Sequence, residues 1–141
     1  MLAEACEIGS LKLVKMCVEY GDDIRYDDDD PIYMACSEGH LHIVKYLVEQ
    51  GNISPEHMYR FLSWAIDYGH LPIVKYLVSQ GADIHNRNGE ALCRASSGGH
   101  LPIVKYLVSQ GADIHNRNDE ALRRAMFFNR AEVAVYLKSL S

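Results

Sequence analysis

The twenty residues GHLPIVKYLVSQGADIHNRN occur twice without a change, at residues 69–88 and 99–118. Related segments start on the same register at Gly9, Gly39 and Asn129, so the sequence repeats every thirty residues. A fixed period of about 20 to 50 residues is typical of solenoids, in which each unit buries its apolar face against its neighbours. We therefore expect one elongated domain over residues 1–141 and a function that lies on an extended surface. Its approximate units are residues 1–24, 25–54, 55–84, 85–114 and 115–141.

The second half of each unit has the spacing of an amphipathic helix. In residues 71–80, apolar side chains recur three and four residues apart. Pro72 is tolerated in a first turn, because the N–H that it lacks would have no acceptor there, and Gly81 can adopt the left-handed conformation that ends a helix. All strong periodicity is helical, which predicts an all-α fold.

A shorter helix is expected before each of these, near residues 90–98 in the fourth unit. Its inward face is expected to hold Leu92, Ala95 and Ser96, and the small residues there would let neighbouring units approach closely. Between units, residues 82–88 contain Asp and Asn, whose short polar side chains favour turns, so no packed helix is expected there.

Three Gly-His pairs, at Gly39, Gly69 and Gly99, are each followed by the segment IVKYLV and then by a glycine, and GADI completes the pattern twice. These motifs resemble those of the ankyrin repeat family over essentially the whole chain. The resemblance implies a solenoid of about five stacked helix-turn-helix units.

Two features depart from the ankyrin pattern. The family's TPLH-x-A motif is poorly kept: DPIYMA at residues 30–35 comes closest, and the usual Thr is absent. The units have thirty residues, against about 33 in familiar ankyrin repeats, which implies shortened fingers between the helix pairs. Units of this short form are similar to those of ankyrin proteins from large DNA viruses.

Composition favours an intracellular protein. The longest apolar runs are a few residues, far short of the roughly 20 that span a membrane. The opening residues lack the basic and apolar regions of a secretion signal. Neither a CxxC pair nor a disulfide framework is visible, so the cysteines are interpreted as free thiols, with Cys6 and Cys36 as small core residues. The cytoplasm or nucleus is expected, or the host cytoplasm for a viral protein, without membrane binding.

Histidines and carboxylates offer no convincing metal site. His40, His70 and His100 are one unit apart, about 10 Å, which is too far to share a zinc ion whose ligands lie at about 2 Å. A role in stabilising the turns is preferred. The acidic run at residues 27–30 lacks the spacing of an EF-hand and is interpreted as a solvated connection, or as an acidic fingertip that faces a basic partner. The ankyrin resemblance implies that His85 and His115 are weak candidates for hydroxylation.

Catalysis and nucleic-acid binding are both disfavoured. No nucleophile elbow, oxyanion loop or glycine-rich phosphate loop is present, so neither an enzyme nor a cofactor is expected. The formal charge of −5 divides into −7 over residues 1–60 and +2 over residues 61–141. Six arginines gather in the last two units, yet a nucleic-acid-binding domain is expected to be strongly basic overall. These arginines are Arg87, Arg94, Arg117, Arg123, Arg124 and Arg130.

The ankyrin resemblance implies binding through a concave face built from fingertips and the exposed side of the first helices. Residues in these places differ between units that are otherwise identical, and aromatic and arginine side chains are the preferred anchors. The predicted partner-binding residues are Asp29, Tyr59, Asp67, Tyr68, Arg94, Arg123 and Phe127. We expect a monomeric, non-catalytic module that binds another protein. The alternative is a structural segment of a longer ankyrin array without its own partner.

Overall fold

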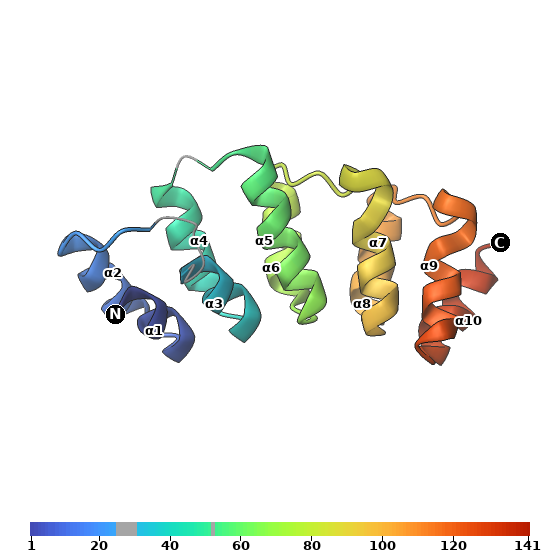
Figure 1. Ribbon diagram of the computed structural model, residues 1–141, viewed down its shortest axis with the longest axis horizontal. Helices are drawn as coiled ribbons and strands as arrows, with labels where there is room; N and C mark the ends of the chain where they lie inside the picture. Colours follow the sequence, from blue (N-terminus) through green and yellow to red (C-terminus); the bar gives the residue numbers. More distant parts are fainter. Residues whose placement is uncertain (25–30, 52) are drawn as a thin grey trace.

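The computed structural model describes residues 1–24, 31–51 and 53–141, whose regular structure is entirely α-helical. Within these residues, five helix pairs stand in a row, with α3, α5, α7 and α9 on the near side of Figure 1 and α4, α6, α8 and α10 behind them. The helices are α1 (Leu2–Ile8), α2 (Leu11–Glu19), α3 (Pro31–Glu38), α4 (Leu41–Gln50), α5 (Pro55–Asp67), α6 (Leu71–Ser79), α7 (Asn86–Gly98), α8 (Leu101–Ser109), α9 (Asn116–Phe127) and α10 (Ala131–Ser139). The predicted all-α stack of helix-turn-helix units is confirmed.

The core runs between the pairs along the whole row. Each first helix packs on the next, α1 on α3, α3 on α5, α5 on α7 and α7 on α9. The second helices fill the space behind with aliphatic side chains such as Ile73 and Leu77, at most 1% exposed. Each such side chain contributes about 1.5–3 kcal/mol on burial. Leu92, Ala95 and Ser96 are buried, as the sequence predicts for the inward face of residues 90–98.

Local chemistry sets where the helices begin. Pro72 lies in the first turn of α6, as predicted. In the third unit, Ser54 accepts a hydrogen bond from the backbone N–H of His57 at 3.3 Å, and Pro55 is the first helical residue. A serine N-cap followed by proline is a strong start signal. The helix α5 therefore begins five residues before Arg60, which is the equivalent of Glu90, where the first helix of the fourth unit is expected to begin.

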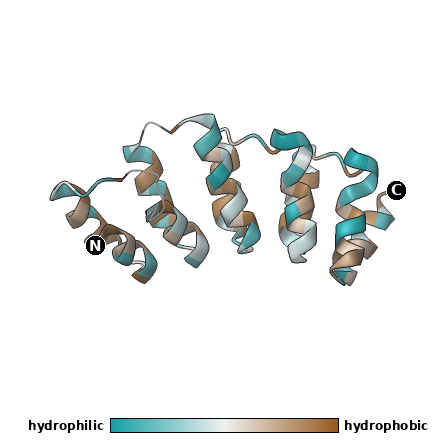
Figure 2. Ribbon diagram, viewed as in Figure 1, coloured by the Kyte–Doolittle hydropathy of each residue, from teal (hydrophilic) through white to brown (hydrophobic). Residues whose placement is uncertain are grey.

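The connections before α7 and α9 each end in a left-handed turn. Arg87, Asn88 and Gly89 all have positive φ, at 51°, 57° and 78°, and residues 117–119 repeat this conformation. The right-handed part of each helix follows this turn. Although α7 is bounded at Asn86, residues 87–89 do not have helical φ and ψ, which agrees with the prediction that residues 82–88 form no packed helix. Figure 2 shows hydrophilic residues at these leading ends of α7 and α9.

The histidine of each Gly-His pair bonds to the unit before its own. His70 Nε2 lies 2.7 Å from the carbonyl oxygen of Ser37, which is the last-but-one residue before the turn glycine Gly39. The same contact joins His40 to Glu7 at 3.0 Å and His100 to Asp67 at 3.1 Å. The sequence predicts that these histidines stabilise the turns. The hydrogen bonds show that they also link neighbouring units.

Lysines and tyrosines of the second helices form a second series of links between units. Lys75 Nζ lies 5.7 Å from the centroid of the Tyr106 ring in the following unit. The equivalent pairs are Lys15 with Tyr46, Lys45 with Tyr76 and Lys105 with Tyr136. An exposed cation–π contact contributes about 0.5–1 kcal/mol, so the identical lysines of the second helices serve packing between units.

All four cysteines are buried, and Cys6 and Cys36 are fully so, which confirms their interpretation as core residues. Trp64 is partly buried and packs against the core. In the part of the chain that the structure describes, the helices are too short or too polar to cross a membrane.

Candidate functional site

The candidate site is the exposed side of α3, α5, α7 and α9 with the residues that lead into these helices, called here the first-helix face. Asp67, Tyr68, Arg94, Arg123 and Phe127 lie on it. Asp29 and the rest of the acidic run at 27–30 fall outside the described residues.

Tyr59 is not the surface fingertip that the sequence predicts, and this expectation is wrong. Because α5 starts at Pro55, Tyr59 lies one turn inside the helix and its residue is 3% exposed. The Arg87 guanidinium covers its ring, with Cζ 5.5 Å from the ring centroid. Its hydroxyl has no hydrogen-bond partner among the described residues.

Asp67 and Arg94, predicted separately as partner contacts, bind each other. Arg94 donates from Nη1 to Asp67 Oδ2 at 2.7 Å, which joins α7 to α5. Burial lowers the pKa of Arg94, but the hydrogen bond and charge of Asp67 outweigh it, so the pKa is raised overall. The side chains are 35% and 39% exposed, so water weakens the pair to about 0–1 kcal/mol.

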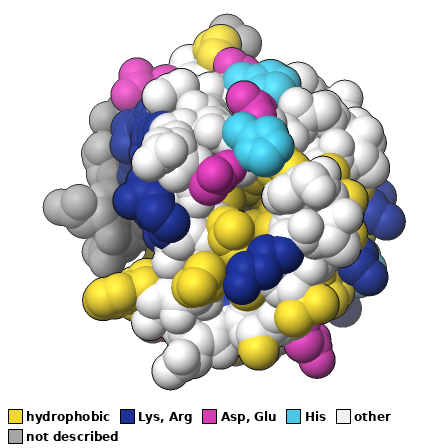
Figure 3. Space-filling view, turned by 90° about the vertical axis from the view of Figure 1, so that its right-hand side faces the viewer, with side chains coloured by type: hydrophobic (Ala, Val, Ile, Leu, Met, Phe, Trp, Pro, Cys, Tyr) yellow, Lys and Arg dark blue, Asp and Glu magenta, His cyan; other side chains and the backbone are white. Residues whose placement is uncertain are grey.

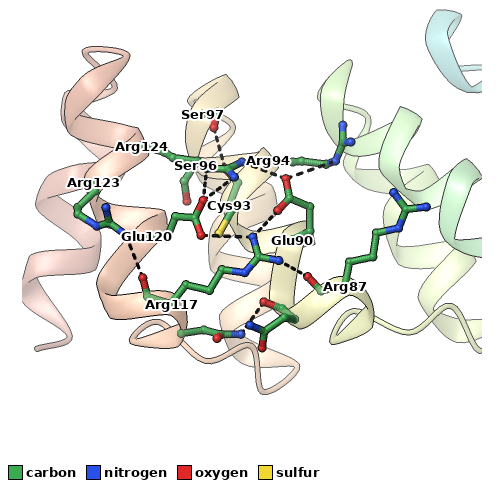
Figure 4. A network of polar contacts seen from close by, with 12 residues as sticks. Arg87, Glu90, Cys93, Arg94, Ser96, Ser97, Arg117, Glu120, Arg123 and Arg124 are labelled. Atoms are coloured by element: carbon green, nitrogen blue, oxygen red, sulfur yellow. Dashed lines mark hydrogen bonds and ion pairs between the residues drawn. The ribbon is translucent and has the colours of Figure 1, made fainter.

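A larger network of arginines and glutamates joins α7 to α9 (Figure 4). Glu90 accepts hydrogen bonds from Arg117 at 2.9 Å and from Arg124 at 3.0 Å, both from the following unit. Glu120 binds the same two guanidinium groups, at 3.3 Å and 2.5 Å. The hydrogen bond from Arg124, followed by that from Arg117, lowers the pKa of Glu120 against the opposing effect of burial. Two of the clustered arginines are thus neutralised within the fold.

Arg123 holds the left-handed turn of its own unit. It donates from Nε to the carbonyl oxygen of Asn118 and from Nη2 to that of Arg117, each at 3.0 Å. Asn116 adds a bond to the carbonyl of Asn88, in the turn of the unit before, at 2.7 Å. Left-handed residues other than glycine cost about 1–2 kcal/mol each, and these hydrogen bonds offset part of that cost.

Aromatic side chains form two groups on the first-helix face. On α3 and α5, the hydroxyls of Tyr33 and Tyr68 are 2.8 Å apart, and the Tyr33 ring meets Trp64 edge-on with centroids 5.0 Å apart. This hydrogen bond raises the pKa of Tyr68, which remains 49% exposed. At the end of α9, Phe127 is 81% exposed and contacts the Phe128 ring edge-on. Sequence reasoning missed Tyr33; its place two residues after Pro31, a proline that can begin a helix, was the available signal.

Exposed hydrophobic side chains also gather on the end face formed by α9 and α10 (Figure 3). Met126, at 54% exposure, stands where the fourth unit has Ser96, at 0%. Val135, on α10, is 68% exposed. In the earlier units the corresponding side of the first helix is covered by the unit that follows.

Among the pockets of the described residues, two lie between neighbouring helices of α5, α7 and α9. The larger, about 420 Å³, lies between α7 and α9 and is lined in part by Arg94, Ser97, Arg124 and Phe128. The smaller, about 140 Å³, lies between α5 and α7 around Tyr59. A drug-sized ligand needs about 300–1,000 Å³ that buries most of its surface, so the smaller pocket fits a single side chain.

Comparison with known proteins identifies the repeat. No curated protein matches the sequence, so the likeness to viral ankyrin proteins gains no support. A family model described as ankyrin repeats (3 copies) matches residues 2–88 and also residues 62–140. Ankyrin repeats are in general protein–protein interaction modules and are typically non-catalytic. Together with the stacked helix pairs, these matches show that the chain belongs to the ankyrin repeat family.

Proposed function

We propose that this chain is a non-catalytic recognition module that binds a partner protein through its first-helix face. The observation that carries the proposal is a contrast between the two helices of each unit. One register of the first helices holds Ser37, Asp67, Ser97 and Phe127, whereas one register of the second helices holds Lys45, Lys75 and Lys105. Packing between units explains the repeated lysines. Among the first-helix residues, packing explains Asp67, which pairs with Arg94, but it does not explain Phe127, which is 81% exposed.

The first-helix face offers the residue types that anchor protein interfaces. Tyr68 and Phe127 present exposed aromatic surface, and aromatic anchors dominate many interfaces. The acidic first half and the more basic second half would attract the two ends of a partner differently. Such a charge gradient fixes the direction of binding and speeds association more than it adds affinity. The proposal includes an intracellular partner and a monomeric chain.

The proposal is tested with a partner captured on the immobilised chain and then purified. Tyr68→Ala and Phe127→Ala should each weaken binding by about thirtyfold or more, because truncating an interface anchor commonly costs 2 kcal/mol or more. Lys75→Ala and Lys105→Ala are the matched controls on the second helices and should change the affinity less than about twofold. Circular dichroism checks that each variant stays folded.

Greater loss from the lysine variants than from the aromatic variants would contradict the assignment of the face. A chain that captures no saturable partner would favour the structural-segment alternative.

A further inference from the structure

The smaller pocket contains donors without acceptors. It lies between α5 and α7, and its lining includes Tyr59, Arg60, Trp64, Arg87 and Arg94. The buried Tyr59 hydroxyl and the buried Arg94 Nε have no hydrogen-bond partner among the described residues. Arg94 Nε is 4.0 Å from Glu90, which is close enough for attraction between charges but too long for a hydrogen bond. Buried polar groups are almost always hydrogen-bonded, so both donors can take an acceptor from outside the described residues.

Two arginines at this pocket also lack a carboxylate. Arg60 lies over the Trp64 ring, with Cζ 5.0 Å from the centroid, and Arg87 lies over the Tyr59 ring at 5.5 Å. Within the residues that the structure describes, neither side chain forms an ion pair. The acidic residue in the lining is Asp67, which Arg94 already binds through Nη1. The pocket therefore has an excess of positive charge.

The equivalent interface one unit later, between α7 and α9, contains a carboxylate that pairs with two arginines. Between α7 and α9, Glu90 accepts hydrogen bonds from Arg117 and Arg124. Thirty residues earlier, the equivalents of these arginines are Arg87 and Arg94, but the equivalent of Glu90 is Arg60. The pocket between α5 and α7 thus repeats the arginine pair of the Glu90 site without its carboxylate.

We propose that this pocket receives the side-chain carboxylate of an Asp or Glu residue on the partner protein. The carboxylate takes the place that Glu90 occupies one unit later, accepts hydrogen bonds from Arg87 and the Tyr59 hydroxyl, and faces Arg60. The inference rests on the proposed function, because it names the chemistry of the group that the first-helix face recognises. Tyr68, at the C-terminal end of α5, would contact an apolar neighbour of that acid.

The test selects random twelve-residue peptides by display against the folded chain, and uses the tightest peptide as the probe. Its acidic residue is changed to the matching amide, and binding is measured to the wild type and to Arg87→Gln and Tyr59→Phe. Lys75→Gln removes the same charge from a second helix and is the matched control. Arg60→Glu is the decisive variant, since it supplies the missing carboxylate within the chain.

The selected peptides should share one Asp or Glu, and its change to the amide should weaken binding to the wild type at least about tenfold, as expected for hydrogen bonds to a charged group. When the same peptide change is measured on Arg87→Gln, it should weaken binding less than about twofold, because the arginine that would bind the peptide acid has been removed. Arg60→Glu should abolish binding and also raise the resistance of the chain to urea, whereas Lys75→Gln should leave binding unchanged.

Peptides that bind without an acid, yet lose affinity on Tyr68→Ala, would overturn this inference and leave the proposed function intact. Peptides that ignore every first-helix variant would overturn both. Arg60→Glu checks the assignment independently, because a merely misfolded variant would show lower resistance to urea and not higher.

Discussion

Arg130 donates a hydrogen bond from Nε to the carbonyl oxygen of Ser97 at 2.8 Å, in the place where the three preceding units use a histidine. In those units, the histidine Nε2 reaches the carbonyl at the same position of the unit before, as between His70 and Ser37. An imidazole and a guanidinium share little except an N–H at a suitable distance. The repeat therefore requires a donor that links adjacent units, and histidine is one way to provide it.

Removing this donor should destabilise the stack. We expect His70→Ala to lower the free energy of unfolding by about 1–2 kcal/mol, since the Ser37 carbonyl loses its partner at a unit interface. His70→Arg should lose less than half as much, because Arg130 shows that arginine can make the same bond. Urea unfolding measures both, with His42→Ala on the exposed side of α4 as the control. Equal losses from the alanine and arginine variants would refute the interpretation.

Gly39 is required for space as well as for its backbone conformation. Its φ is +81°, and a Cβ built on it would lie 2.8 Å from the ring of His70. Gly81 has a similar φ of +99° but open space around the same position. Both alanine variants should lose about 1 kcal/mol or more from backbone strain, and Gly39→Ala should lose at least about 1 kcal/mol more from overpacking. Unfolding curves that coincide would show that the contact with His70 yields easily.

The network around Glu120 should make stability depend on acid pH. Its pKa is lower in the folded chain than the ordinary glutamate value, chiefly through the hydrogen bond from Arg124. Such a group stabilises the fold above the unfolded pKa of about 4.3, and this contribution is lost as the pH falls through the lower folded pKa. Urea unfolding between about pH 6 and pH 3 should thus show a smaller loss for Glu120→Gln than for the wild type. Glu132→Gln, on the exposed side of α10, should behave as the wild type does.

The core of the repeat follows from its spacing and can be tested at one residue. Leu77 is fully buried between units, so Leu77→Ala should cost about 2–5 kcal/mol in urea unfolding. Val135, on α10, is 68% exposed, and Val135→Ala should stay within about 0.5 kcal/mol of the wild type. Similar losses at the two positions would contradict the assignment of the core.

The sequence predicted the helix pairs and the core well, but predicted the candidate site poorly, for physical reasons. Burial of Leu77 and Ala95 follows from spacings of three and four, because these place side chains on one side of a helix. The position of Tyr59 depends instead on where α5 starts, which the local pair Ser54-Pro55 decides against the register of the repeat.

Side-chain contacts between units also cannot be predicted from the spacing of apolar residues. Asp67 and Arg94 are 27 residues apart, and their ion pair depends on how closely α5 and α7 approach. The contact of Arg123 with its own backbone depends on three left-handed residues, two of which are asparagine and aspartate and one of which is arginine. Asparagine and aspartate tolerate that conformation, but arginine gives no signal of it. For this reason the sequence assigns Asp67, Arg94 and Arg123 to a partner-binding surface, although each of them forms contacts within the chain.

Tyr59 and Tyr33 provide a last test, because they differ in whether their hydroxyls are satisfied. The Tyr33 hydroxyl lies 2.8 Å from that of Tyr68, whereas the buried Tyr59 hydroxyl has no partner among the described residues. Tyr33→Phe should lower the free energy of unfolding by about 0.5–1 kcal/mol. Tyr59→Phe removes a buried donor that makes no bond, so it should leave stability unchanged or raise it by up to about 1 kcal/mol. Urea unfolding of both variants decides the matter, and a loss above about 1 kcal/mol for Tyr59→Phe would mean that its hydroxyl is bonded in the free protein, which would leave no unfilled donor there for a partner to satisfy.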